Sequence, residues 1–189
     1  MDNIITVDLG EKLVRSHEVT VVTEMRPEFL PLATLVHDED GRALLYSREN
    51  LVPIAHYGRG APPETDDISG LGMVFSLLTG YIRCLLSARD MLLDTKLLSS
   101  NPEEGVFLVR ERYSGVKVKA VWGKDDLQNE GEKICRIAGT LAGFERVMGA
   151  KTSMERMIEI IRSENPSLIN CLKAAESVCR EWNHIVRAS

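Results

Sequence analysis

The stretch "ISGLGMVFSLLTGYIRCLLS", residues 68–87, decides the fold. Its nearly continuous apolar surface predicts a helix, although its three glycines each cost about 1 kcal/mol relative to alanine. A helix that is apolar all round is usually a central core helix. About 20 residues is also the length of a membrane span, but Arg83 near the end of the stretch disfavours one. We therefore expect a buried helix and no stable membrane insertion.

Short strands are predicted on both sides of this helix. Before it, "HEVTVVTEM" (17–25) alternates and is rich in β-branched residues. The stretch "DEDG" (38–41) predicts a hairpin turn between two apolar segments. After the helix, three further strands are predicted at "TKLLSS" (95–100), "GVFLVRE" (105–111) and "GVKVKAVWG" (115–123).

The remainder of the chain is predicted to be helical. Segment 126–149 is interrupted by glycines. Thr152 and Glu155 have the spacing of a capping box, which predicts the start of the next helix. Asn165 and Pro166 should then end that helix and start the last one.

The order of strands, one long helix, strands and then helices is typical of an α+β protein. We expect a single domain over residues 1–189, with a mainly β layer in 1–60 and a mainly α layer in 61–189. The second layer should hold a small sheet around 96–122. The stretch "GRGAPPETDD" (58–67) combines glycines, prolines and acids, and it is predicted to link the two layers.

The composition bounds the classes of function. The chain is 44% hydrophobic and 27% charged, with a net charge of -5. It has no basic half, which disfavours nucleic acid because phosphate backbones are bound by clustered cations. Its cysteines form no C-x-x-C pair, and no histidine or cysteine cluster has the spacing of a zinc site. The first residues carry acids where a signal peptide carries cations. We expect a cytoplasmic protein without a metal or cofactor.

A second stretch, "ARDMLLDTKLL" (88–98), resembles the catalytic loop of protein kinases. In that loop, an Arg-Asp pair is followed by a magnesium-binding Asn, and a strand hairpin leads to a second metal-binding Asp. Arg89 and Asp90 match the pair. Thr95 stands in place of the Asn, and Arg110 stands where the second Asp belongs.

These departures remove the metal ligands of a kinase. A magnesium ion is bound through carboxylate oxygens, and an arginine in that place repels a cation. The N-terminal strands also carry neither a glycine-rich phosphate loop nor a Val-Ala-Ile-Lys motif. The resemblance implies a vestigial kinase-like loop on a non-catalytic scaffold. The alternative is that an Arg-Asp pair before a leucine-rich segment arises by chance.

A longer stretch, residues 66–109, is similar to an uncharacterised bacterial domain found ahead of forkhead-associated domains. The shared features are an apolar helix with a tyrosine (Tyr81), a leucine-rich segment ending in Asp94, and the strand "VFLV" (106–109). The soluble domain of a type VII secretion component, itself a non-catalytic kinase relative, has a similar layout. Both resemblances imply a pseudokinase-like scaffold that binds proteins.

The last predicted helix carries a seam like that of a coiled coil. Its apolar residues follow spacings of four and three: Leu168, Leu172, Ala175, Cys179, Trp182 and Val186. In one interpretation, the seam packs on the preceding helix of the same chain. In the other, Trp182 together with Leu172 and Cys179 docks a partner or a second copy, because aromatic anchors dominate interface energies.

The sequence thus favours a non-enzymatic, cytoplasmic bacterial protein that acts as a protein-interaction or signalling scaffold, with a protein partner or as a homodimer. The alternative is a small cytoplasmic enzyme or nucleotide-binding protein whose site is assembled from distant residues. A rise in melting temperature with magnesium and ATP would favour that alternative.

Overall fold

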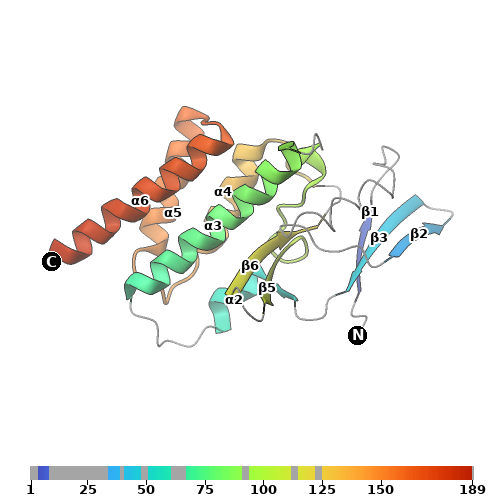
Figure 1. Cartoon of the computed structure of the whole chain (residues 1–189), viewed down its shortest axis with the longest axis horizontal. Coiled ribbons are helices and arrows are strands. Elements are labelled where there is room, and N and C mark those ends of the chain that lie inside the picture. The colour runs from blue at the N-terminus through green and yellow to red at the C-terminus, as the bar shows by residue number, and fades with distance from the viewer. Residues whose placement is uncertain are drawn as a thin grey trace.

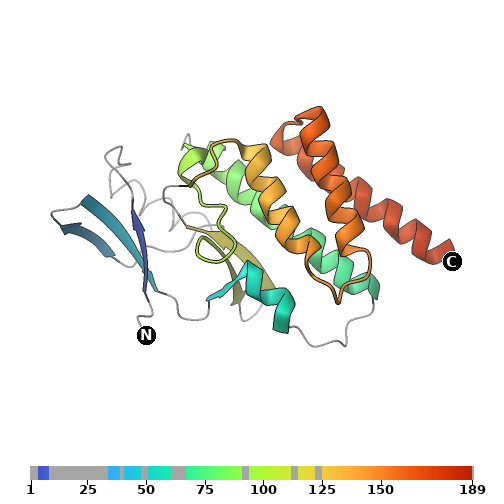
Figure 2. The same cartoon turned by 180° about the vertical axis from the view of Figure 1, so that it is seen from behind.

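The computed structural model describes residues 4–8, 34–38, 41–47, 51–60, 67–90, 94–111, 115–121 and 125–188. Within these residues lie two small antiparallel sheets and a group of helices that packs on one of them (Figure 1 and Figure 2). The predicted α+β class is confirmed. The expectation of a single domain stays a prediction.

The central helix is α3 (Asp67–Asp90), as the apolar stretch 68–87 predicts. It packs against a sheet strand and two further helices, so apolar residues on several of its faces are buried. Gly80 faces Val118 of the sheet so closely that an added Cβ would lie 2.9 Å from the valine Cγ2. The glycine at this position therefore lets the helix backbone approach the sheet.

Helix α3 is long and apolar enough to cross a membrane over Gly70–Asp90. Yet 61% of the apolar window in that stretch is buried by the rest of the protein. Such burial is what a core helix shows, which agrees with the predicted absence of stable membrane insertion.

The sheet beneath α3 has the order β4-β5-β6, with β4 at Leu51–Pro53, β5 at Val106–Glu111 and β6 at Gly115–Ala120. Strands β5 and β6 lie where the sequence predicts strands at 105–111 and 115–123, and they pair in an antiparallel manner with Leu108 opposite Val118. Its third strand comes from upstream of the predicted range 96–122, because β4 pairs with β5. Helix α2 (Ile54–Gly60) follows β4 directly and buries Ile54.

The N-terminal sheet has the order β1-β3-β2, with β1 at Ile4–Asp8, β2 at Thr34–Asp38 and β3 at Gly41–Ser47. Asp38 pairs with Gly41, which confirms the predicted hairpin turn at 38–41. The strand predicted at 17–25 lies outside the described residues.

One strand prediction is wrong. Residues Thr95–Leu97 of the segment "TKLLSS" form a 3-10 helix, η1, and Leu98 makes only a single bridge. Asp94 caps η1 by accepting a hydrogen bond from the Lys96 backbone N–H at 3.0 Å. The side chain of Lys133, from a distant helix, also donates hydrogen bonds to the carbonyls of Thr95 and Lys96. These bonds favour a turn over an extended strand.

The helical part contains α4 (Glu130–Ala142), α5 (Ala150–Glu164) and α6 (Leu168–Ala188). The predicted capping box at Thr152 and Glu155 is wrong, because α5 already begins at Ala150 after a left-handed Gly149 with φ 76°. The predicted end of α5 is confirmed, since Asn165 adopts φ 43° and its N–H bonds to the Ile161 carbonyl.

Helix α6 packs against both α3 and α5 (Figure 1 and Figure 2). Its predicted seam faces these two helices: Leu168 and Ala175 are buried, and Leu172, Cys179 and Trp182 are partly buried against the core. The side chain of Val186 lies outside the described ones.

Candidate functional site

Two residues of the predicted vestigial loop are held by one carboxylate. Glu130, the first residue of α4, accepts hydrogen bonds from the Arg89 guanidinium, with the Nε–Oε1 distance at 2.8 Å. It also accepts from the Thr95 hydroxyl at 2.7 Å. Glu130 therefore ties the end of α3 and the start of η1 to the start of α4.

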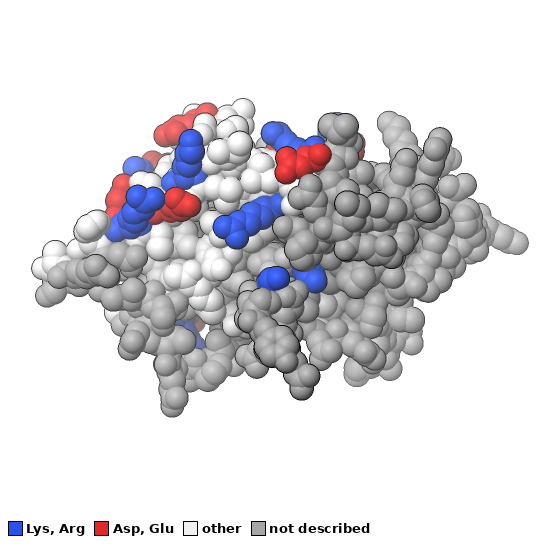
Figure 3. Space-filling model, in the orientation of Figure 1, with Lys and Arg blue, Asp and Glu red and all other residues white. Residues whose placement is uncertain are grey.

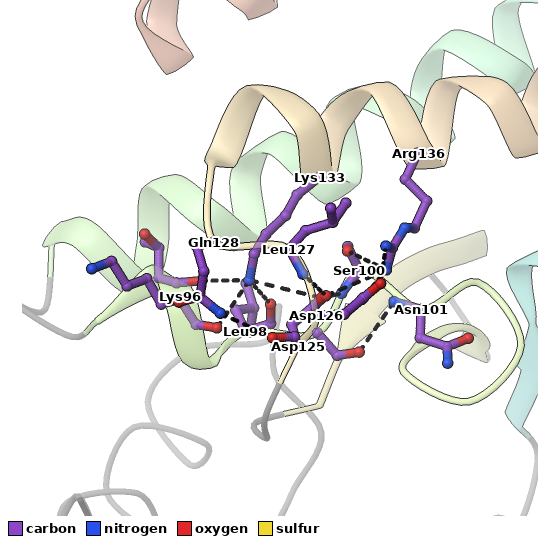
Figure 4. Close-up of polar contacts among 12 residues, drawn as sticks. Lys96, Leu98, Ser100, Asn101, Asp125, Asp126, Leu127, Gln128, Lys133 and Arg136 are labelled. Atoms are coloured by element: carbon purple, nitrogen blue, oxygen red, sulfur yellow. Dashed lines mark hydrogen bonds and ion pairs between the residues drawn. The ribbon is translucent and has the colours of Figure 1, made fainter.

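Next to this contact, Lys133 of α4 points into the protein interior and is fully buried. Its ammonium group donates to the backbone carbonyls of Thr95 at 2.9 Å, Lys96 at 3.1 Å and Leu98 at 2.5 Å. These carbonyls all come from the loop that resembles a kinase catalytic loop (Figure 4). The inner side of the loop is thus filled by a lysine of the same chain.

A buried carboxylate, Asp125, completes the network in Figure 4. Its Oδ2 accepts from the Ser100 N–H and lies 3.8 Å from the Lys133 Nζ. Its Oδ1 accepts from the Leu127 N–H at 2.9 Å and from Arg136 at 3.3 Å. These donors replace the water that a buried carboxylate lacks.

At the surface edge of the network, Arg136 forms a bidentate ion pair with Asp126. The Nη1–Oδ1 distance is 2.7 Å and the Nη2–Oδ2 distance is 2.6 Å. The hydrogen bond from Arg136 is the main reason why the pKa of Asp126 lies well below its ordinary value of 3.8. The same hydrogen bond raises the pKa of Arg136. Burial lowers the pKa of Lys133, and the negative charge of Asp125 opposes that shift.

Asp90 does not join this network. Asp90 is exposed at the end of α3 and makes no hydrogen bond or ion pair with the part of the chain that the structure describes. Arg110 lies in β5 with its backbone opposite Val116, so the strand continues through the position where the resemblance would place a metal ligand. Glu130 brings Arg89 and Thr95 together, and Asp90 lies apart from them; the side chain of Arg110 lies outside the described ones.

The described residues contain no cluster of three or more His, Cys, Asp or Glu side chains that could hold a metal ion. Two of the four thiols are also poorly suited to nucleophilic chemistry. Burial raises the pKa of Cys171 to about 11 and also raises the pKa of Cys135. Both thiols therefore stay protonated at neutral pH, and the protonated form is not the nucleophile.

A groove lies between α3 and α6, with a volume of about 410 Å³. It is lined by Gly72, Phe75, Ser76, Thr79 and Arg83 from α3, and by Leu172, Ala175, Glu176, Cys179 and Arg180 from α6. Two of the three predicted interface residues, Leu172 and Cys179, thus line a surface depression.

The third predicted interface residue, Trp182, lies elsewhere. Its indole packs on Gly149, so closely that a Cβ added to the glycine would lie 2.3 Å from the indole Cε2. Trp182 thus anchors α6 to the start of α5 within the chain, and it is partly buried there. This contact fits the interpretation that the seam packs inside the chain.

The sequence reasoning missed Glu130, Lys133 and Asp125. A signal for Lys133 exists, because it lies four and eight residues before Ile137 and Leu141 on the apolar face of α4. A lysine within an apolar stripe suggests a buried ammonium group with acceptors. Its acceptors are backbone carbonyls, which carry no sequence signature.

Charges of both signs are interspersed on the described surface shown in Figure 3, with no extended patch of one sign. Comparisons of the chain with protein-family models, with curated proteins and with solved structures find no match. The family resemblances expected from the sequence are therefore untested.

Proposed function

We propose that the chain is a non-catalytic, cytoplasmic protein-interaction scaffold with a degraded, kinase-like loop, and that it binds its partner in the groove between α3 and α6. The groove carries this proposal. It has an apolar floor that includes Phe75, Leu172 and Ala175 and a polar rim, which is the arrangement of protein interfaces.

The state of the loop supports the non-catalytic part of the proposal. Arg89 and Thr95 both donate hydrogen bonds to Glu130. The buried ammonium group of Lys133 donates hydrogen bonds to the backbone carbonyls of the loop. A catalytic loop instead presents an Asp and an Asn towards substrate and metal. Here the hydrogen bonds of the loop connect α3 to α4.

Phosphate transfer provides the first test. The purified chain, mixed with magnesium and ATP, should show neither phosphate incorporation nor a rise in melting temperature. Asp90→Ala should leave both measurements unchanged, because Asp90 is exposed and outside the network. Magnesium-dependent phosphorylation that Asp90→Ala abolishes would overturn the proposed function.

Site-specific crosslinking provides the second test. A photoreactive amino acid at Glu176, on the rim of the groove, should crosslink to a discrete protein in cells. The same amino acid at Arg156, which is exposed on α5 away from the groove, is the matched control. Equal crosslinking from both positions, or none from Glu176, would contradict binding in the groove.

A further inference from the structure

The length of the groove matches a short helix. Its lining on α3 runs from Gly72 to Arg83, which is about 16 Å at 1.5 Å per residue. That length corresponds to about three helical turns. On both walls the lining residues recur every three or four positions, so the groove runs along the two helices.

The cross-section of the groove suits an amphipathic ligand. Phe75 and Ala175 are buried in its floor, and Leu172 and Cys179 are partly buried beside them. The rim residue Gly72 has open space around it, because a Cβ added there meets no atom within 4 Å. Amphipathic helices bind such grooves through apolar residues spaced three or four apart.

The charges at the two ends of the groove favour an acidic partner. Helices α3 and α6 run in opposite directions (Figure 1), so Arg83 and Arg180 line opposite ends. Arg83 is exposed and makes no hydrogen bond or ion pair within the described part of the chain. Arg180 bonds to Glu176 at 3.2 Å, one turn towards the middle of the groove. An acid in the middle of a ligand would face Glu176, whereas acids at its ends would face the arginines.

We propose that this groove binds an amphipathic helix of a partner protein that carries acidic residues at both ends of its apolar face. The inference rests on the proposed function and specifies the partner of the same groove. Complementary charges at the rim select the partner and its register, while the apolar floor supplies the burial.

The probe is a fluorescein-labelled helical peptide of about 15 residues, with leucines spaced three and four apart and glutamates at both ends. Its counterpart carries lysines in place of the glutamates. Fluorescence polarisation with the full chain should show at least tenfold tighter binding of the glutamate peptide.

Reversing one charge should exchange the preference. Arg83→Glu should weaken binding of the glutamate peptide about tenfold and strengthen binding of the lysine peptide. Lys173→Glu is the matched control: it makes the same change in net charge at an exposed residue of α6 that does not line the groove. It should change neither affinity by more than about twofold.

Filling the groove tests its location. The Gly72→Leu variant should fold, since the space around this position is open, and it should bind the glutamate peptide about tenfold more weakly. The Gly72→Ala variant should bind this peptide with nearly unchanged affinity. Bound peptide should also slow alkylation of Cys179 several-fold. The other thiols, Cys84, Cys135 and Cys171, are buried and should stay unlabelled in the folded chain.

Three results would overturn the inference. They are equal binding of the two peptides, binding without protection of Cys179, and a dimer that Gly72→Leu converts to a monomer while neither peptide binds. The last result would assign the groove to a second copy of the chain. All three leave the proposed non-catalytic function standing, because that function fails only through phosphate transfer or through the crosslinking test.

Discussion

At the scale of single residues, the Lys133 ammonium group donates hydrogen bonds to three backbone carbonyls and lies near the Asp125 carboxylate. Lys133→Met keeps the side chain apolar and long but leaves these acceptors buried without their donor. We expect a loss of about 3–5 kcal/mol in the free energy of unfolding, the usual cost of removing one partner of a buried charge pair.

Chemical denaturation of the Lys133→Met variant gives this value directly. Lys173→Met, at an exposed position of α6, is the matched control and should stay within about 0.5 kcal/mol of the wild type. A Lys133→Met variant as stable as that control would show that the ammonium contributes nothing net to the fold.

The ion pair between Asp126 and Arg136 should make stability depend on pH. Because the pKa of Asp126 is lowered in the folded state, its contribution is present above the unfolded value of about 3.8. It is lost as the pH falls below that value. Asp126→Asn should therefore be less stable than the wild type at pH 7, and the difference should shrink below pH 4. Thermal unfolding at several pH values measures it, and a difference that is the same at all of them would contradict the assignment.

At the scale of elements, the contact between α5 and α6 depends on Gly149. Its φ of 76° is strained for other residues, and its surface touches the Trp182 indole. Gly149→Ala should lose about 1–3 kcal/mol of stability through the backbone alone, and more through the clash. In a Trp182→Ala background the added loss should be smaller, because the clash is gone.

Gly139→Ala is the control for this double-mutant cycle. Gly139 lies within α4, and an added Cβ meets no atom within 4 Å, so the substitution should stabilise the helix by up to about 1 kcal/mol. Strictly additive effects of Gly149→Ala and Trp182→Ala in denaturation experiments would mean that the two residues do not touch in solution.

At the scale of the whole molecule, the described buried core runs from Ile54 to Val178. A chain that begins at residue 51 keeps this core and keeps β4 paired with β5. We expect it to unfold cooperatively with the helix content of residues 51–189 in the full chain, as judged by circular dichroism.

A chain that begins at residue 61 is the comparison, because it lacks β4 and the fully buried Ile54. It should be clearly less stable than the chain that begins at 51. Non-cooperative unfolding of the longer fragment would instead mean that residues 1–50 complete the core, as the expectation of one domain over 1–189 allows.

Local patterns predicted much of this fold, and distant contacts account for the errors. Helix α3 follows from its own apolar residues, and the hairpin at 38–41 from its turn residues. The sequence does not predict the 3-10 turn at Thr95, because its carbonyls accept hydrogen bonds from Lys133, which lies in another helix. The start of α5 was misplaced because Gly149 is fixed by packing against Trp182.

The candidate site was predicted in part for the same reason. The spacing of four and three along α6 identified Leu172 and Cys179, which form one wall of the groove. The other wall comes from α3, about 100 residues earlier, and no periodicity relates Gly72 to Arg180. A groove between two helices needs both walls, so a single amphipathic pattern gives only half of it.

The burial of α3 has a consequence for biosynthesis. The elements that cover it, β6, α4 and α6, all follow it in the chain. At a translation rate of 5–20 residues per second, α3 leaves the ribosome roughly 5–20 seconds before α6, the last of the elements that cover it. During that interval the nascent chain displays a segment apolar enough to insert into a lipid bilayer. Ribosome-bound chaperones that shield such segments should therefore raise the yield of folded protein.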